Sequence, residues 1–406
     1  MKIIFQDPTF SLQLLRTIGQ TYYKGADIGE CLSTAYRIKE GDFESWYAEW
    51  LKTAKRVHKY ADECLAVNHK TSAREAYLRA SNYYRVAEFL LIDPHDPRIQ
   101  TRWGSSKECF TNAGRLFSPP VESIEIPYEG TTLPGHFYHA NADSNKSNST
   151  PRPTLIAHGG FDSTLEELYA SAAAPALERG YNCLTFEGPG QGGVIRKQEI
   201  PFRYDWEKVV IPVVDYALTR DKEIDPNRIA LMGISMGGYL AARAAAFEHR
   251  IAACILYNGV YDGYDAFASG FPKSLRLAVE DGNGDIVNSV VEILSDLDAN
   301  MRFNLKHGIW TTGTNSPFEL IQESKKYTVK DIAQKIRCPT LVLEAEKDDS
   351  FPGQPKKVYD ALTCPKKYIR FTIEEGAEEH CQCGAPAISN QRIFDWLDET
   401  SHKPQP

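Results

Sequence analysis

Residues 10–118 carry apolar side chains at steps of three and four positions, which is the period of an amphipathic helix. The stretch FESWYAEWLKTAKRVHKYADECLAV predicts a helix whose buried stripe consists of Trp46, Trp50, Ala54, Val57 and Ala61. A second stretch, TSAREAYLRASNYYRVAEFLL, repeats the period. In it Thr71 or Ser72 is the expected N-cap, and Glu75 would complete a capping box. The first part of the chain is therefore predicted to be almost entirely helical.

The helical pattern ends at Ser118, Pro119 and Pro120, because proline cannot continue a helix and restricts the residue before it. We therefore expect residues 1–118 to form a helical N-terminal domain and residues 119–406 to form a second domain.

After this boundary the spacing changes to that of β-strands. VESIEIPYEGTTLPGHFYHA alternates like a hairpin with its turn at residues 129–130, and the polar residues 141–153 are expected in an exposed loop. Short apolar runs alternating with helical patterns then predict a mostly parallel, doubly wound α/β sheet; these runs are TLIAHGG, YNCLTFEG, RIALMGIS, AACILYNG and PTLVLEAE. Residues 262–335 show no strand pattern, so an inserted cap is expected there.

Composition narrows the classes of partner. The chain has 406 residues with 46 basic and 54 acidic side chains, a net charge of −8 without long runs, which argues against nucleic acid or an anionic membrane as partner. We find no signal-peptide pattern and no apolar stretch long enough to span a bilayer. The nine cysteines include no Cys-x-x-Cys pair, so we expect reduced thiols, no metal site and a cytoplasmic protein.

A nucleophile motif, Gly-x-Ser-x-Gly, occurs at residues 233–237 and is centred on Ser235. The motif alone is weak, but RIALMG before it predicts a buried strand and GYLAARAAAFEH after it predicts a helix. Strand, sharp turn and helix form the setting of a nucleophile elbow, in which the serine hydroxyl stands exposed at the carboxyl edge of the sheet. The helix that follows favours negative charge at its N-terminus.

A general base and an acid should follow the serine along the chain, in the order serine, acid, histidine. Among the later histidines, His249 is expected on the surface, His307 in the cap and His402 in the polar tail; His380 follows the last predicted strand and is the expected base. The preceding strand is followed by three candidate acids. Of these, Asp348 is the expected partner of the histidine, Asp349 the alternative and Glu346 the least favoured.

The oxyanion formed during acyl transfer needs backbone N–H donors. One is expected from Met236, after the nucleophile, and one from Phe161 or Gly160 in the His-Gly-Gly-Phe-Asp loop at 158–162. GPGQGG at 188–193 has neither Gly-x-Gly-x-x-Gly spacing nor a phosphate-binding lysine. We expect it to be a tight turn beside the active site, with no cofactor.

These motifs together resemble one group of α/β-hydrolases. HGGFDST at 158–164, FEGPGQGG at 186–193, GISMGG at 233–238 and EEHCQCG at 378–384 are similar to the group of FrsA-like esterases. The group is typified by 2,6-dihydroxypseudooxynicotine hydrolase and includes fungal polyketide-processing hydrolases. The resemblance extends to the helical stretch SAREAYLRASNYYRVAEF. It implies a homodimer whose helical segment covers the active-site entrance, and by position it implies the triad Ser235, Asp348 and His380.

The expected function is a serine hydrolase acting on a small secondary metabolite, through cleavage of an ester, an amide or a carbon–carbon bond next to a ketone. An acyltransferase or cyclase, or a non-catalytic small-molecule binder, is the alternative. Aromatic residues that would suit a planar ligand are Tyr83, Tyr84, Phe161, Tyr261 and Trp310. A second active-site acid, which the resemblance implies, would be Asp262 or Asp265. The expected substrate contacts are Tyr84, Arg85, Asp162, Asp262 and Trp310.

Overall fold

A computed structural model describes residues 1–140 and 150–401 of the chain. Its centre is a sheet of eight strands in the order β1-β2-β4-β3-β5-β6-β7-β8. The strands are β1 (Glu122–Tyr128), β2 (Thr131–Tyr138), β3 (Arg152–His158), β4 (Asn182–Phe186), β5 (Ile224–Ile234), β6 (Ala253–Tyr257), β7 (Thr340–Ala345) and β8 (Lys366–Phe371). Only β1–β2 and β2–β4 pair antiparallel. The sheet is therefore the mostly parallel sheet that the five apolar runs predicted.

Both faces of the sheet are covered, as a doubly wound fold requires. Successive residues of β3 belong to different cores: Leu155 and Ala157 pack into one, and Ile156 into the other. Helices α7 (Glu207–Leu218), α8 (Gly237–Ala245) and α14 (Gln354–Ala361) cover one face, and α6 (Ala174–Glu178) and α15 (Pro386–Ser401) cover the other. Because side chains on both faces of the central strands are buried, these strands have unbroken apolar sequences.

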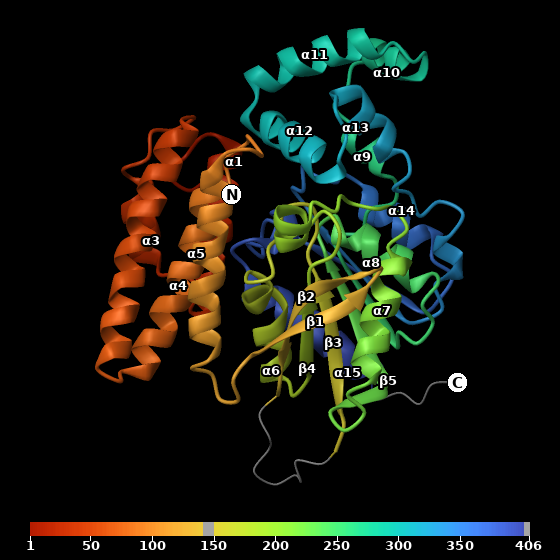
Figure 1. Cartoon of the computed structure of the whole chain (residues 1–406). Helices are drawn as coiled ribbons and strands as arrows, with labels where there is room; N and C mark the ends of the chain where they lie inside the picture. The colour runs from red at the N-terminus through yellow and green to blue at the C-terminus, as the bar shows by residue number, and fades with distance from the viewer. Residues whose placement is uncertain (141–149, 402–406) are drawn as a thin grey trace.

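The N-terminal part is helical, as its spacing predicted. It consists of α1 (Pro8–Gly19), α2 (Ile28–Ala35), α3 (Phe43–Ala66), α4 (Lys70–Glu88) and α5 (Pro97–Gly114). In Figure 1 these helices stand beside the sheet. The predicted stripe of α3, from Trp46 to Ala61, is completely buried. Its side chains belong to the same core as Leu155 of the sheet, so this core continues from the N-terminal helices to the sheet.

The predicted capping box was wrong. Helix α4 begins two residues earlier than an N-cap at Thr71 would place it, with His69 at the N-cap position and no side-chain cap, so Thr71 and Ser72 lie inside its first turn. The reason is the short connection from α3. Asn68 adopts a left-handed backbone with φ 61°, which reverses the chain and starts the helix at once.

The predicted hairpin is confirmed, because β1 and β2 pair in register around Glu129 and Gly130, both of which have positive φ. Most of the expected loop at 141–153 lies outside the described residues. At its end, the expectation was wrong for Arg152, which already pairs in β3.

The expected cap lies between β6 and β7 and is built of helices, and one isolated β-bridge joins Asp262 to Thr328. The helices are α9 (Gly263–Phe267), α10 (Lys273–Glu280), α11 (Gly284–Leu297), α12 (Ala299–Thr312) and α13 (Pro317–Ser324). They share a small apolar core that includes Leu275, Val287 and Ile321. Figure 1 shows α10 to α13 above the sheet, next to α1. Within the described residues, no helix combines the length and apolar character needed to cross a membrane.

Candidate active site

Ser235 lies in the turn between β5 and α8, at the carboxyl edge of the sheet. Its φ is 63°, a left-handed conformation that is strained for a serine, and its N–H donates to the carbonyl of Tyr257 at 2.8 Å. The flanking glycines are required sterically. A Cβ on Gly233 would overlap the Gly237 carbonyl, and one on Gly237 would lie 2.6 Å from the Gly159 carbonyl oxygen. The turn thus has the geometry of a nucleophile elbow.

His380 lies on the loop after β8 and joins Ser235 to Asp348 in one chain of hydrogen bonds. The Ser235 hydroxyl lies 2.8 Å from His380 Nε2, and His380 Nδ1 lies 2.9 and 3.0 Å from the two carboxylate oxygens of Asp348. With Nδ1 protonated, His380 donates to Asp348 and its Nε2 accepts the serine proton. Three side chains from well-separated parts of the chain therefore meet in the order that proton transfer from the serine requires.

Asp348 is held as an ionised acceptor. It is buried, Ser350 N–H donates to its Oδ1 at 2.9 Å, and the side-chain amide of Asn258 donates to its Oδ2. Burial alone would raise the pKa of Asp348, but the His380 imidazole and these donors hold it below its usual value. Burial likewise opposes the charged form of His380, yet the Asp348 carboxylate raises the pKa of His380 well above its usual value.

The alternative acids and bases lie elsewhere. Asp349 is exposed at the cavity wall, and Glu346 accepts the Ile373 N–H at 2.8 Å. His249 is exposed, as expected, and His307 lies on α12 in the cap. The remaining candidate, His402, lies outside the described residues.

The expected oxyanion donors lie on two loops that approach each other closely at the elbow. The backbone N–H groups of Phe161 and Met236 have no acceptor among the described residues, whereas Gly160 N–H donates to Ser163 Oγ at 3.3 Å. Gly160 is therefore already engaged, which favours Phe161 of the two alternatives. A Cβ on Gly160 would lie 2.8 Å from the Met236 nitrogen, so only glycine lets the two loops approach this closely.

The GPGQGG turn holds the 158–162 loop in place, a role that the sequence did not specify; this loop carries the expected donor Phe161 and is called the oxyanion loop below. The Gln191 side-chain amide donates to the carbonyls of Gly159 and Gly160 at 2.8 and 3.1 Å, and its oxygen accepts the Gly188 N–H. With the loop carbonyls held in this way, the peptide of Phe161 is fixed beside the elbow. The signal available in the sequence was the glutamine inside an otherwise glycine-rich turn.

A cavity of about 770 Å³ opens over Ser235 and His380, between the N-terminal helix α1 and the cap. Its size is within the range of pockets for drug-sized molecules. Much of its wall is aromatic or aliphatic; these residues include Phe89, Phe161, Phe267, Phe271, Met301 and Phe303.

Of the five expected substrate contacts, the structure places only Asp162 at this cavity. Tyr84 is buried in the helical part, where its hydroxyl lies 3.2 Å from His58 Nδ1, and Arg85 lies behind Glu167 rather than at the wall. Asp262 caps α9, and Trp310 packs against Arg196. These four side chains therefore lie away from the cavity wall. Helical periodicity shows which face of a helix is buried but not which element that face packs against.

Of the remaining candidates from the sequence, Phe161 lines the cavity, and the others lie away from its wall. Tyr83 is buried among the N-terminal helices, and Tyr261 donates its N–H to the Gln354 side chain. Asp265, the other candidate second acid, binds Gln354 and Lys357. Asp262 and Asp265 therefore make structural contacts, and neither carboxylate lines the cavity.

Two residues beside Asp348 and His380 were not predicted from the sequence. Asn258 follows the end of β6 at the same edge of the sheet as Ser235, which was a usable signal. Cys381 has φ 51° and places its sulfur 3.3 Å from His380 Nε2, at the cavity wall. Its position depends on the local backbone turn, so spacing alone could not reveal it.

One group among the described residues has side chains close enough together to ligate a metal ion. The ligand atoms of Glu122, His139 and Glu223 lie within 4.8 Å of one another. Arg220 already pairs with both carboxylates, at 2.9 and 2.7 Å. The group lies at the amino end of β5, and Ser235 follows its carboxyl end, so the group takes no part in the site.

Comparisons with known families agree with this architecture. The sequence matches the family described as "Alpha/beta hydrolase family" over residues 155–382 and "Esterase FrsA-like" over residues 23–263. Each match covers more than half of the chain.

Individual relatives align almost end to end. The chain is 37% identical to Hydrolase LUC6 of Fusarium sp, over 98% of each protein. It is 36% identical to 20-hydroxy-prefusarin hydrolase FUS2 of Gibberella moniliformis, again over 98% of each. Among solved structures, 2,6-dihydroxy-pseudo-oxynicotine hydrolase superimposes with a TM-score of 0.75 at 24% identity, covering 95% of this chain and 96% of that one. At this identity the superposition shows a shared fold.

Proposed function

The chain belongs to the α/β-hydrolase family, in its FrsA-like group, and we propose that it cleaves an acyl bond in a small secondary metabolite through Ser235, His380 and Asp348. The observation that carries the proposal is the hydrogen-bonded chain, with the Ser235 hydroxyl 2.8 Å from His380 and His380 2.9 Å from Asp348. Such a chain activates a hydroxyl that is otherwise a weak nucleophile.

The proposed reaction has two steps. His380 takes the Ser235 proton while the serine oxygen attacks a carbonyl, and the Phe161 and Met236 amides bind the resulting oxyanion. His380 then gives that proton to the leaving group, and water releases the acyl product by the reverse sequence. If the leaving atom is carbon, it departs as an enolate or another stabilised carbanion.

The substrate class rests on the relatives and the cavity. One relative is named for the hydrolysis of 20-hydroxy-prefusarin, and the cavity of about 770 Å³ with aromatic walls suits a molecule of drug-like size. We therefore propose an apolar, medium-sized metabolite carrying an ester, an amide or a ketone beside the cleaved carbon–carbon bond.

Fluorophosphonate labelling tests the nucleophile. The wild type should form a covalent adduct at Ser235, and Ser235→Ala should lose both the adduct and at least about 10⁴-fold in kcat. Ser171→Ala is the matched control, because this second hydroxyl also lines the cavity and should leave labelling intact. Labelling that persists in Ser235→Ala would exclude Ser235 as the nucleophile.

Product analysis in ¹⁸O-labelled water separates hydrolysis from acyl transfer or cyclisation. Hydrolysis places one heavy oxygen in the acid product, because water attacks the acyl-enzyme. An unlabelled product would assign the chain to acyl transfer on the same scaffold.

A further inference from the structure

Gln13 is a polar side chain that the fold does not use. It lies on α1, is only 7% exposed and lines the cavity above Ser235. Its backbone carbonyl accepts from Thr17, but its side-chain amide has no hydrogen-bond partner among the described residues. Because this amide lines the cavity and the protein supplies no partner for it among the described residues, a ligand bound in the cavity can donate to or accept from it.

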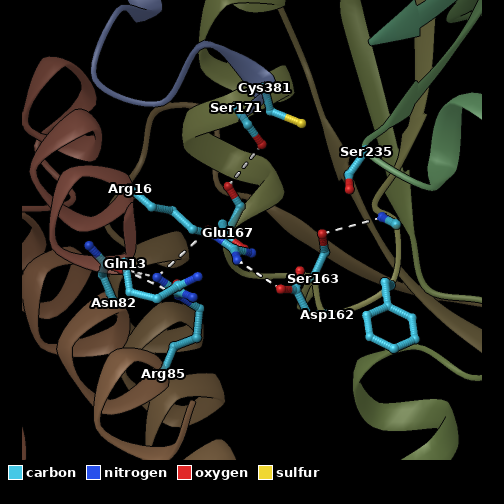
Figure 2. Close-up of polar contacts among 12 residues, drawn as sticks. Gln13, Arg16, Asn82, Arg85, Asp162, Ser163, Glu167, Ser171, Ser235 and Cys381 are labelled. Carbon is cyan, nitrogen blue, oxygen red and sulfur yellow. Dashed lines mark hydrogen bonds and ion pairs between the residues drawn. The ribbon is translucent and has the colours of Figure 1, made fainter. Parts of the chain in front are cut away.

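Arg16, one turn further along α1, lines the same wall. Its guanidinium donates to both oxygens of Glu167, at 2.6 and 2.5 Å, and to Asp162 at 3.2 Å. Because a guanidinium carries five N–H groups, two remain without an acceptor within the described part of the chain. In Figure 2 the labelled side chains of Arg16, Glu167, Asp162 and Ser163 lie together on the side of Ser235 that faces the N-terminal helices.

Around Arg16 the positive and negative side chains are equal in number, whereas the cavity as a whole has more acids than bases. Arg16 and the buried Arg85 behind it offset Asp162 and Glu167. Burial opposes ionisation of Glu167, but Arg16 and Arg85 keep the pKa of this carboxyl below its usual value. Apart from His380, the charged residues lining the whole cavity are one arginine and five acids, namely Arg16, Asp162, Glu167, Asp298, Glu323 and Asp349. An anionic group would therefore meet an excess of negative charge.

We propose that Gln13 and Arg16 form a subsite that binds a neutral carbonyl or hydroxyl oxygen of the substrate, separate from the acyl carbonyl that Ser235 attacks. This inference rests on the proposed function and deepens it by naming a second feature of the substrate. Both residues offer N–H donors, and Gln13 also offers an acceptor, so a ketone, an enol or an alcohol can bind there.

The aromatic side chains of the cavity wall indicate that the rest of the substrate is apolar. Phe89 packs on Phe303 with ring centroids 4.5 Å apart, and Arg16 lies over the Phe89 ring at 5.5 Å. The substrate is therefore a neutral molecule with an apolar body, a reactive acyl group at one position and a second oxygen function reaching α1. A carboxylate at the second position is disfavoured.

Alkyl fluorophosphonates test the subsite without knowledge of the natural substrate. The probes are a decyl fluorophosphonate, three analogues with a ketone at carbon 4, 6 or 8, and one ending in a carboxylate. The readout is the second-order rate of Ser235 labelling. At least one ketone probe should label the wild type about five- to tenfold faster than the plain decyl probe, since one neutral hydrogen bond contributes about that factor. The carboxylate probe should be slower than the plain one.

Two variants test whether the rate advantage of the ketone probe depends on Gln13. Gln13→Met keeps the length and volume of the side chain but removes the amide, so the ketone probe should lose its rate advantage over the plain probe. Gln6→Met, at an exposed glutamine, should retain the advantage. Equal rates for all ketone and plain probes, or an advantage that survives Gln13→Met, would overturn the subsite. Absence of any Ser235 labelling would instead overturn the proposed function.

Discussion

Asp348 does more than add a negative charge behind His380. Because its carboxylate accepts from His380 Nδ1, the proton is kept on that nitrogen and Nε2 is left free for the serine hydroxyl. Asn258 and Ser350 occupy other lone pairs of Asp348. The imidazole is thereby set in one tautomer and one orientation before substrate binds.

The pH dependence of activity should report this pair. The base must be neutral, and Asp348 raises the pKa of His380, so the acid limb of kcat/KM should have its midpoint above 6.5. Asp348→Asn should lower kcat by about 10⁴-fold and move the limb to lower pH, because the carboxylate no longer stabilises the imidazolium. The measurement is kcat/KM against pH with an activated aryl ester.

Asp349→Asn is the control for this experiment. Asp349 is the next residue and is exposed, so its variant should keep the wild-type rate and midpoint. A limb that stays in place in Asp348→Asn, or moves equally in Asp349→Asn, would argue against Asp348 as the partner of the base.

At the scale of elements, the oxyanion loop is held from three directions. The 188–193 turn binds the loop carbonyls through Gln191, the cap helix α12 contacts Phe161 through His307, and α1 pairs Arg16 with Asp162. Two of these elements lie in segments added to the central sheet. The N-terminal helices and the cap therefore contribute to the alignment of a backbone donor as well as to the cavity wall.

His307 provides a direct test of this support. Burial lowers its pKa to about 4, so near neutral pH the ring is uncharged and its Nε2–H donates to the Phe161 carbonyl at 3.0 Å. His307→Leu should lower kcat about tenfold with KM within about twofold, because a misaligned oxyanion donor weakens only the transition state. His307→Gln can place an N–H near the position of Nε2 and should recover most of the rate. Equal losses in both variants, or a loss confined to KM, would contradict this positioning function.

On the scale of the whole molecule, one buried cluster runs from Trp46 in α3 through Leu155 in the sheet to Phe394 in α15. The boundary near residue 118 is therefore a change of structural class along the chain without a break in the core. Continuous packing of this kind favours cooperative unfolding. We expect a single thermal transition when helical signal and tryptophan fluorescence are followed together, and two separated transitions would show independent units.

Stability should fall in mild acid for a specific reason. Burial lowers the pKa of His136 to about 3 and those of His158 and His307 to about 4. Between pH 6.5 and 4 the unfolded chain binds protons at these histidines that the folded protein does not, so stability decreases as pH falls through this window. Differential scanning fluorimetry should show a decrease in Tm on the order of 5–10 °C from pH 7 to 4.5.

Two histidine variants isolate this contribution. His136, which stacks on Phe110, can be replaced by phenylalanine, and His136→Phe should show a smaller decrease in Tm than the wild type. His249→Phe changes an exposed histidine and should keep the wild-type slope. Burial raises the pKa of Glu166 to about 8 and also raises the pKa values of Glu88 and Glu187, so these carboxyls act in the opposite direction. They do so in every variant and do not affect the comparison. Identical slopes in wild type and His136→Phe would refute the assignment.

Patterns confined to a few neighbouring residues were sufficient for the elements and for the elbow. Apolar runs predicted the parallel strands, three- and four-residue steps predicted α3, and glycines on both sides of Ser235 predicted a turn too tight for other side chains. The chain order of serine, acid and histidine favoured His380 and limited the acid to a group of three that includes Asp348 and the alternative Asp349, because the carboxyl ends of parallel strands share one edge of the sheet. These signals were readable because each constraint acts within a few residues or follows from topology.

The cavity wall depended on packing between distant segments. By sequence pattern, Gln13 and Arg16 are ordinary polar positions of an amphipathic helix, whereas Tyr84 and Trp310 resembled ligand contacts. Periodicity determines which face of a helix is buried, but the partner of that face is determined by how all helices pack around the sheet. The sequence by itself thus determined the strands, the elbow and the order of the triad candidates. Only the tertiary structure decided which side chains of α1 and the cap reach the cavity, because that depends on contacts between residues hundreds of positions apart.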